Sequence, residues 1–190
     1  MIHSEKCAII ELFVPKNVDT PLCARYHVSK EEGQMKRNLY DKLIEWKDNP
    51  YRKPLVIKGA RQVGKTFLIT EFGENEFDSF VVLNCDKDPR IKEIFANGFR
   101  VDQIISYISV LSGQRIVPGR TLLFIDEVGD VPEALSSLKY FCEDAPEYHL
   151  AAAGSLLGVA VNREKYAFPV GKVDRHTMYP MDMEEFLLAL

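Results

Sequence analysis

The stretch Gly59-Ala60-Arg61-Gln62-Val63-Gly64-Lys65-Thr66 decides the fold of this chain. It matches the phosphate-binding loop G-x-x-x-x-G-K-[ST] at every fixed position. In such a loop the glycines let the backbone curl, so that successive N–H groups point at a phosphate. We expect Lys65 to reach the β- and γ-phosphates and Thr66 to hold Mg²⁺ through its hydroxyl. A helix that begins here directs its positive end at the same anion.

The segments around this loop alternate between apolar strands and helices. Pro54–Lys58 is a short apolar strand that leads into the loop, and Lys65–Phe72 is the helix behind it. Apolar strands separated by helices predict an α/β fold, in which helices cover both faces of a parallel sheet. The other expected elements are strands at Phe80–Asn84, Thr121–Ile125 and His149–Ala153, and helices at Ile91–Phe95 and Val101–Leu111.

Two further helices show boundary signals. A helix is expected to start near Met35, and Asp48-Asn49-Pro50 stops it. The run Asp130-Val131-Pro132-Glu133 opens another helix, with Asp130 as its N-cap and Glu133 completing a capping box.

Two acidic residues, Asp126 and Glu127, follow the apolar strand Thr121–Ile125. At the carboxyl end of a strand they fall in the crevice where open α/β sheets bind ligands. We expect Asp126 to hold Mg²⁺, directly or through water, and Glu127 to orient and deprotonate an attacking water. The alternative is structural, because acids after a strand are also typical of a helix N-cap or a solvated turn.

Ser155 is a third catalytic candidate, beside Lys65 and Glu127, because it ends the strand that starts at His149. A hydroxyl there would hydrogen-bond the γ-phosphate or the attacking water. It would serve equally well as an N-cap for the following turn. An arginine finger, from this or a neighbouring subunit, is harder to assign, since surface salt bridges are the commoner fate of such cations. The candidates are Arg61, Arg163, Lys172 and Arg175.

The composition suits one globular domain. The chain has 190 residues, 46% of them hydrophobic and 27% charged, with a net charge of −4. No apolar run approaches the roughly 18 residues of a membrane span, so no membrane contact is expected. Four scattered cysteines fit a reducing, cytoplasmic compartment. The basic stretch from Lys36 to Lys65 most simply serves the nucleotide or stays solvated, and nucleic-acid contact is the alternative.

Residues 1–34 lack the sustained pattern of the rest of the chain. The pairs His3-x3-Cys7 and Cys23-x3-His27 would supply four zinc ligands. Two prolines lie between the pairs and no zinc-finger spacing occurs, so an incidental extension is the favoured interpretation.

The segment just before Met35 suggests a different start for the protein. Purine-rich codons for Lys30-Glu31-Glu32-Gly33 would look like a ribosome-binding sequence. We therefore hypothesise that translation begins at Met35 and that residues 1–34 are a mis-assigned leader. Coding DNA unlike AGGAGG upstream of codon 35 would remove the motive for this hypothesis.

Several segments together carry a family resemblance. They are Met35–Asn38, Arg52–Thr66, Leu122–Glu127, Ala152–Ser155, Phe168–Val173 and Tyr179–Leu187. Together they resemble a large prokaryotic family of AAA-type ATPases, in which the ATPase domain precedes a C-terminal domain of unknown function. Leu122–Glu127 is similar to its Walker B strand, and Ala152–Ser155 to its polar sensor segment. The last two segments are similar to its Gly-Arg/Lys element and its Pro-Leu-Ser-x-x-Glu-Phe-Leu signature.

The resemblance implies a three-layer P-loop NTPase fold of the additional-strand type, with strand order 5-1-4-3-2, and ATP with Mg²⁺ as ligands. Family members begin near Met35 and continue beyond the Glu-Phe-Leu signature. By this resemblance, residues 1–34 are a foreign extension, 35–190 are the ATPase core, and the C-terminal domain is absent. A second copy or another protein would then be a partner through that missing region. Lys172 stands where arginine is usual, which weakens its assignment as a finger.

The leading interpretation is Mg²⁺-dependent ATP hydrolysis. A nucleotide-dependent switch that turns over very slowly is the first alternative, and an inactive gene fragment is another. A small-molecule kinase is disfavoured, because Glu127 is placed to activate water rather than a larger acceptor.

Overall fold

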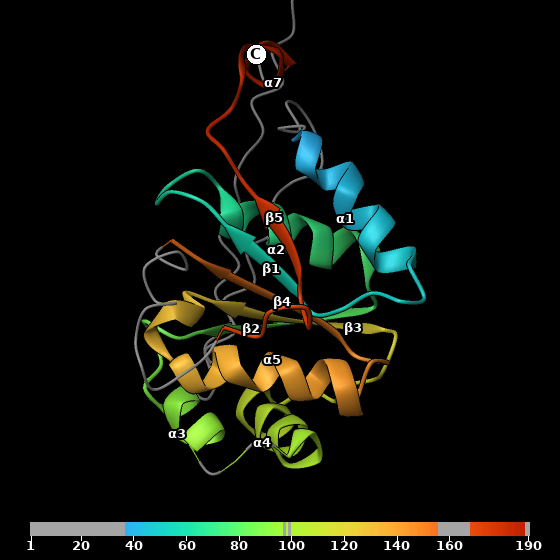
Figure 1. Cartoon of the computed structure of the whole chain (residues 1–190), viewed down its shortest axis with the longest axis vertical. Coiled ribbons are helices and arrows are strands. Elements are labelled where there is room, and N and C mark those ends of the chain that lie inside the picture. The colour runs from blue at the N-terminus through green and yellow to red at the C-terminus, as the bar shows by residue number, and fades with distance from the viewer. Residues whose placement is uncertain (1–36, 97, 99, 156–167, 189–190) are drawn as a thin grey trace, which may run out of the picture.

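A computed structural model describes residues 37–96, 98, 100–155 and 168–188 of the chain (Figure 1). Helices and strands alternate through most of this part, as the sequence predicts. In chain order the elements are α1 (Asn38–Asp48), β1 (Leu55–Lys58), α2 (Lys65–Glu76), β2 (Ser79–Asn84), α3 (Arg90–Ala96), α4 (Val101–Ser112), β3 (Thr121–Asp126), the 3-10 turn η1 (Val128–Asp130), α5 (Pro132–Asp144), β4 (His149–Gly154), β5 (Asp174–Thr177) and α7 (Met183–Leu188).

The five strands form one parallel sheet in the order β2-β3-β4-β1-β5. Counted from the other edge this is 5-1-4-3-2, which confirms the predicted fold class and strand order. Because all the strands run the same way, their carboxyl ends share one edge of the sheet. At that edge Lys58 is in register with Gly154, and Asn84 with Asp126.

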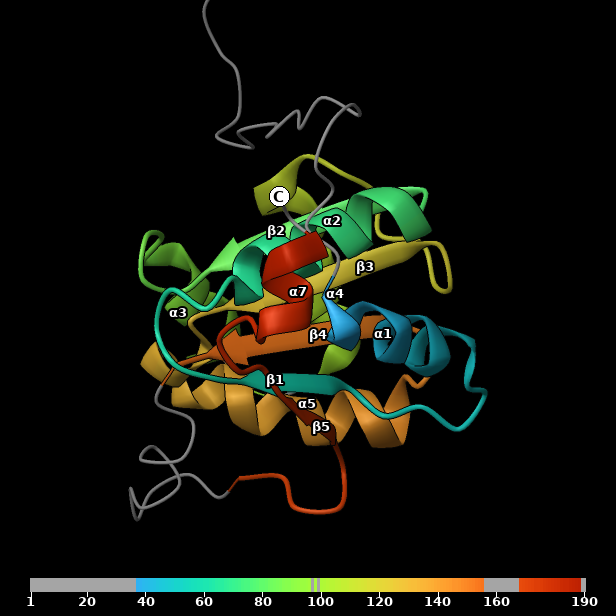
Figure 2. The ribbon, with the colours of Figure 1, turned by 90° about the horizontal axis from the view of Figure 1, so that it is seen from above.

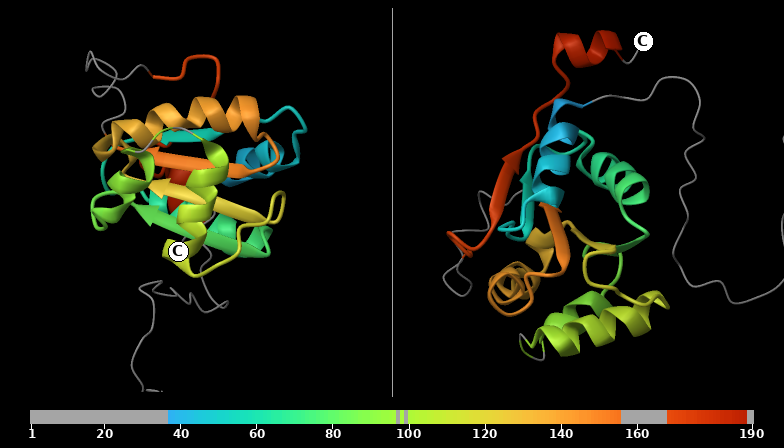
Figure 3. Two further views of the ribbon diagram at one scale, coloured as in Figure 1. Left: turned by 90° about the horizontal axis from the view of Figure 1, so that it is seen from below. Right: turned by 90° about the vertical axis from the view of Figure 1, so that its right-hand side faces the viewer.

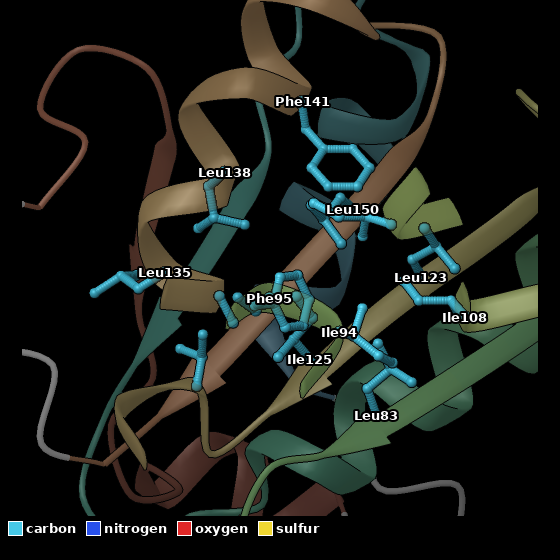
Figure 4. Packing of buried hydrophobic residues seen from close by; sticks show 14 of the residues in the cluster. Leu83, Ile94, Phe95, Ile108, Leu123, Ile125, Leu135, Leu138, Phe141 and Leu150 are labelled. Carbon is cyan, nitrogen blue, oxygen red and sulfur yellow. The ribbon is translucent and has the colours of Figure 1, made fainter. Parts of the chain in front are cut away.

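Helices cover both faces of the sheet, and each face has its own apolar core (Figures 1 and 3). Strand β1 shows why: Val56 points to the core under α3, α4 and α5, while Leu55 and Ile57 point to the core under α1 and α2. Figure 4 shows the first of these cores, where Phe95 and Phe141 pack among aliphatic side chains. Alternate residues of the buried strands thus fill opposite cores, as expected for a sheet covered on both sides.

The helix boundaries correct two predictions. Helix α1 begins at Asn38, with Arg37 in extended conformation as its N-cap, rather than near Met35. Asp130 is not the N-cap of α5, because it closes the 3-10 turn η1; Val131 is the N-cap and makes no side-chain cap hydrogen bond. The proline at the start of α5 was predicted correctly, since its missing N–H needs no partner there.

The apolar pattern of the sequence did not predict strand β5, because β5 is an edge strand of polar residues, Asp174-Arg175-His176-Thr177. In the part of the chain that the structure describes, no helix is long and apolar enough to cross a membrane. The proposed zinc ligands, residues 1–34 and Arg163 lie outside the described residues.

Candidate functional site

The phosphate-loop sequence lies between β1 and α2, at the carboxyl edge of the sheet. Two of its residues adopt the left-handed conformation, Gln62 with φ of 62° and Gly64 with φ of 93°. Gly64 is the N-cap of α2, and its carbonyl accepts the N–H of Leu68 at 2.9 Å. A glycine suits this position because a Cβ disfavours positive φ. The loop therefore ends at the positive end of a 12-residue helix.

Lys65 is buried at the start of α2, with its ammonium group folded over the loop. Its Nζ donates to the carbonyl oxygens of Gly59 at 3.0 Å and of Ala60 at 2.7 Å. A buried ammonium needs such acceptors or an anion, because an uncompensated charge in the interior is costly. Lys65 thus places a positive charge at the loop, while its predicted contact with the β- and γ-phosphates stays a prediction.

Asp126, at the end of β3, is the centre of a hydrogen-bond cluster that connects the loop to two strands. Its Oδ2 accepts from Thr66 Oγ1 at 3.0 Å and from Asn84 Nδ2 at 3.3 Å. Its Oδ1 accepts from the backbone N–H of Glu127 at 3.1 Å. The structure therefore brings together Thr66 and Asp126, the two residues predicted to hold a metal, although 60 positions separate them.

The electrostatics of Asp126 bear on cation binding. Burial raises the pKa of this carboxyl, and the negative charge of Glu127 raises it too, against the lowering effects of the Thr66 hydroxyl, the Glu127 N–H and the Lys65 charge. Burial disfavours the charged form of this carboxyl, and a cation bound beside it would stabilise that charged form.

The donor set at the loop is a hydroxyl and a carboxylate, which are hard oxygen ligands of the kind Mg²⁺ prefers. Among the described residues no group of three or more His, Cys, Asp or Glu is arranged to hold a metal by itself. This fits Mg²⁺, which is usually bound by one or two protein ligands together with phosphate oxygens and water. The residues present therefore fit the ion that the motif implies.

Glu127 follows Asp126 in a left-handed conformation, with φ of 49°. Its Oε2 accepts a hydrogen bond of 3.4 Å from Ser155 Oγ, at the end of β4. The side chain of Glu127 also lines a hollow of about 290 Å³ together with Arg61, Gln62, Asp86 and Asp130. The structure thus places the two predicted catalytic residues Glu127 and Ser155 side by side, next to the loop.

Three of the candidate arginine fingers lie in the described part of the chain, and each has different surroundings. Arg61 lines the hollow that contains Glu127. Lys172 instead pairs at 2.9 Å with Glu143, near the end of α5, and precedes the strand that starts at Asp174. It therefore lies at the amino edge of the sheet, away from the loop of this chain. Arg175 places its guanidinium over the ring of Phe168, 5.7 Å from its centroid.

Several residues at the site were not predicted to take part in it. Asn84 donates to Asp126, and Asp86 and Asp130 line the hollow. The polar side chain of Asn84 at the end of β2 was a signal for its role, because parallel strands end at a common edge. Arg37, whose guanidinium contacts the loop at Val63, had no such signal, since its partners are distant in sequence.

The comparison with known families agrees with this geometry. The profile of a family described as an AAA domain matches residues 51–187, which is most of the chain. The chain belongs to the AAA domain family. The match makes it a P-loop ATPase domain, a class of nucleotide-binding domains, and it spans the loop, Asp126, Glu127 and β5. No curated protein matches the sequence.

Proposed function

We propose that this AAA domain binds ATP with Mg²⁺ and hydrolyses it to ADP and phosphate. The observation that carries the proposal is the hydrogen bond between Thr66 and Asp126, which joins the phosphate loop to the acidic end of β3. It brings a hydroxyl and a carboxylate, suitable as magnesium ligands, to the loop that contains Lys65.

Each group at the site has a distinct task in this proposal. The loop N–H groups and Lys65 bind the phosphate oxygens, and the positive end of α2 adds to their attraction. Thr66 and Asp126 hold the Mg²⁺, which when bound neutralises charge on the phosphate oxygens. Little covalent chemistry is required of the protein, because phosphoryl transfer to water depends mainly on positioning and electrostatics.

Glu127 is the proposed general base. Its carboxylate lines the hollow beside the loop, where a water has room. The Ser155 hydroxyl donates to one of its oxygens at 3.4 Å, a long contact that favours one orientation of the carboxylate. Glu127 would orient the attacking water and accept its proton, while Ser155 acts as the positioning residue.

A nucleotide-dependent switch with very slow turnover is a second candidate function. Arg61 is the cation among the five residues that line the hollow. A second cation on the γ-phosphate is worth about 10³–10⁵ in rate where it occurs. If Arg61 does not reach the γ-phosphate, the chain is expected to turn over slowly even where it binds ATP tightly.

The test compares the wild-type chain with Lys65→Ala by calorimetric titration with Mg·ATP and by phosphate release. The proposal predicts binding and measurable hydrolysis by the wild type, and loss of tight binding in the variant because the loop loses its charge. Tight binding without turnover would favour the switch. Absence of both binding and an ATP-dependent rise in Tm would contradict the proposal and favour the inactive fragment.

A further inference from the structure

Arg37 is a buried cation with three partners in distant parts of the chain. Its Nη1 donates to the carbonyl of Val63 in the phosphate loop at 2.9 Å, and its Nη2 donates to the carbonyl of Tyr179 at 2.6 Å. Its Nε forms an ion pair with Glu185 Oε2 at 3.2 Å, and only 5% of the Arg37 side chain is exposed. Arg37 therefore joins the start of α1, the loop, and the segment between β5 and α7.

The contact with Val63 has a consequence for the next peptide group. In a trans peptide the C=O and the following N–H point in opposite directions. The N–H of Gly64 therefore points away from the guanidinium that binds the Val63 carbonyl. In this loop motif the inward N–H groups are the ones that contact the phosphate.

Glu185 is itself firmly held. Its Oε1 accepts the backbone N–H of Asn38 at 2.9 Å, and its Oε2 accepts that of Asp182 at 3.2 Å. Asp182 Oδ1 in turn accepts the N–H of Glu185 at 2.8 Å, so the two residues form a capping box at the start of α7. Figure 2 shows α7 beside the first turn of α1.

Helix α7 is held against the domain by its charged residue Glu185 rather than by its apolar side chains. Glu185 is 6% exposed, whereas Met183, Phe186 and Leu187 are all largely exposed. A carboxylate is rarely buried in preference to apolar neighbours unless it has a charged partner. Within the described part of the chain, Glu185 therefore connects α7 to the start of α1 through the Arg37 side chain and the Asn38 N–H.

We propose that Arg37 is a positioning residue for phosphate binding, and that Glu185 controls it. Arg37 fixes the Val63–Gly64 peptide in the orientation that receives the phosphate, and the α7 segment fixes Arg37. Nucleotide affinity and the docking of α7 are then linked. Because such coupling is reciprocal, ATP also stabilises the docked position of α7.

This inference rests on the proposed nucleotide binding, and its test begins with the Mg·ATP affinity of the wild type. In Arg37→Lys the charge beside Glu185 is kept, but a lysine lacks the planar fork that reaches two carbonyls at once. We expect the Kd for Mg·ATP to rise at least about tenfold, which is about 1.4 kcal/mol. Glu185→Gln, which keeps the oxygen acceptor and removes the charge, is expected to raise the Kd by a smaller factor.

The matched control is Lys47→Met, which breaks the ion pair of Lys47 in α1 with Glu76 in α2, at 3.0 Å. This pair lies at the ends of α1 and α2 that are distant from the loop. A merely structural role of Arg37 predicts that both variants lower Tm and leave the Kd unchanged. The proposal predicts a raised Kd for Arg37→Lys alone, even when the two variants lose the same Tm.

A double variant, Arg37→Met with Glu185→Gln, measures the coupling directly. If the two residues act as one unit, the double variant loses no more affinity than Arg37→Met does. Wild-type protein that does not bind Mg·ATP would contradict the proposed function itself. Wild-type binding together with unchanged affinity in Arg37→Lys and Glu185→Gln would overturn the inference; if Arg37→Lys does not fold, the affinity of Glu185→Gln decides.

Discussion

Gly59 lies so close to Met178 that a Cβ added to Gly59 would meet the Met178 carbonyl oxygen at 2.3 Å. The two residues are this close because the pairing of β5 with β1 continues past the end of both strands. The Met178 N–H donates to the carbonyl of Lys58 at 2.7 Å. The first glycine of the phosphate loop is therefore required twice, by the loop and by the strand beside it.

Gly59→Ala is expected to destabilise the fold, because the obstructing atom belongs to the backbone and has little room to move. We expect a loss of about 1–3 kcal/mol, or about 2–12 °C in Tm. The control is Gly129→Ala, since a Cβ at Gly129 would have no atom within 4 Å. Thermal unfolding of both variants is the measurement, and an equal change in the two would argue against the close packing at Gly59.

Thr66 provides a test of magnesium binding. Thr66→Val removes the hydroxyl that bonds to Asp126, while Thr66→Ser keeps it. We expect Thr66→Val to weaken Mg·ATP binding at least about tenfold while binding metal-free ATP as the wild type does. Titrations with Mg²⁺ and with EDTA distinguish the two cases. Equal losses in both conditions would mean that Thr66 acts on the loop rather than on the metal.

Asp126 predicts an unusual dependence of stability on pH. Burial raises the pKa of this carboxyl above its ordinary value of 3.8. The folded state therefore binds more protons than the unfolded state between that value and the raised pKa, so this group makes stability fall as pH rises through the window. Asp126→Asn lacks the effect.

The difference in Tm between wild type and Asp126→Asn, measured from pH 3.5 to 8, should shift in favour of the variant as pH rises. A difference that does not vary with pH would contradict the raised pKa. The variant is also expected to lose Mg²⁺-dependent ATP binding, because an amide lacks the charge that attracts the cation.

His149 predicts a loss of stability in mild acid. Its ring packs edge-on against Trp46 and Phe77, with Arg52 Nη2 3.4 Å from Nδ1. Burial, together with the charge of Arg52, lowers the pKa of His149 to about 4. Below about pH 6.5 this histidine is protonated in the unfolded chain but stays neutral in the folded chain. The free energy of unfolding therefore falls as pH drops from 6.5 toward 4.

At pH 5 the loss from this histidine is on the order of 1–2 kcal/mol relative to pH 7.5. His149→Gln, which has no titrating ring, should lose less stability over the same interval. Chemical denaturation at the two pH values gives the comparison. Parallel losses in wild type and variant would show that His149 does not carry the acid sensitivity.

The sequence was sufficient to predict the central fold and to predict that the phosphate loop and Asp126 lie together at one edge of the sheet. The phosphate loop, and the acids after the strand that ends at Asp126, are local patterns, and the parallel sheet places them at one edge. Strand β5 could not be predicted from the apolar pattern, because an edge strand of polar residues has no apolar period. The start of α5 was misplaced because the intervening turn η1 takes up Asp130.

The contacts of Arg37 show what local patterns cannot supply. Arg37 lies 26 positions from Val63 and 142 from Tyr179, and its role depends on α1 and α7 meeting at the loop. Its burial is also unexpected for an arginine, since charged side chains are seldom fully buried without a partner. Only the three-dimensional arrangement reveals Glu185 as that partner.

The most direct measurement of the central claim uses Glu127→Gln, in which the side chain keeps its size but can no longer take a proton. Mg·ATP affinity and phosphate release are measured on the same sample, with the wild type alongside. The proposal predicts affinity within about twofold of the wild type and a rate of hydrolysis at least about 100-fold lower. Unchanged hydrolysis in Glu127→Gln would contradict the assignment of this carboxylate as the base.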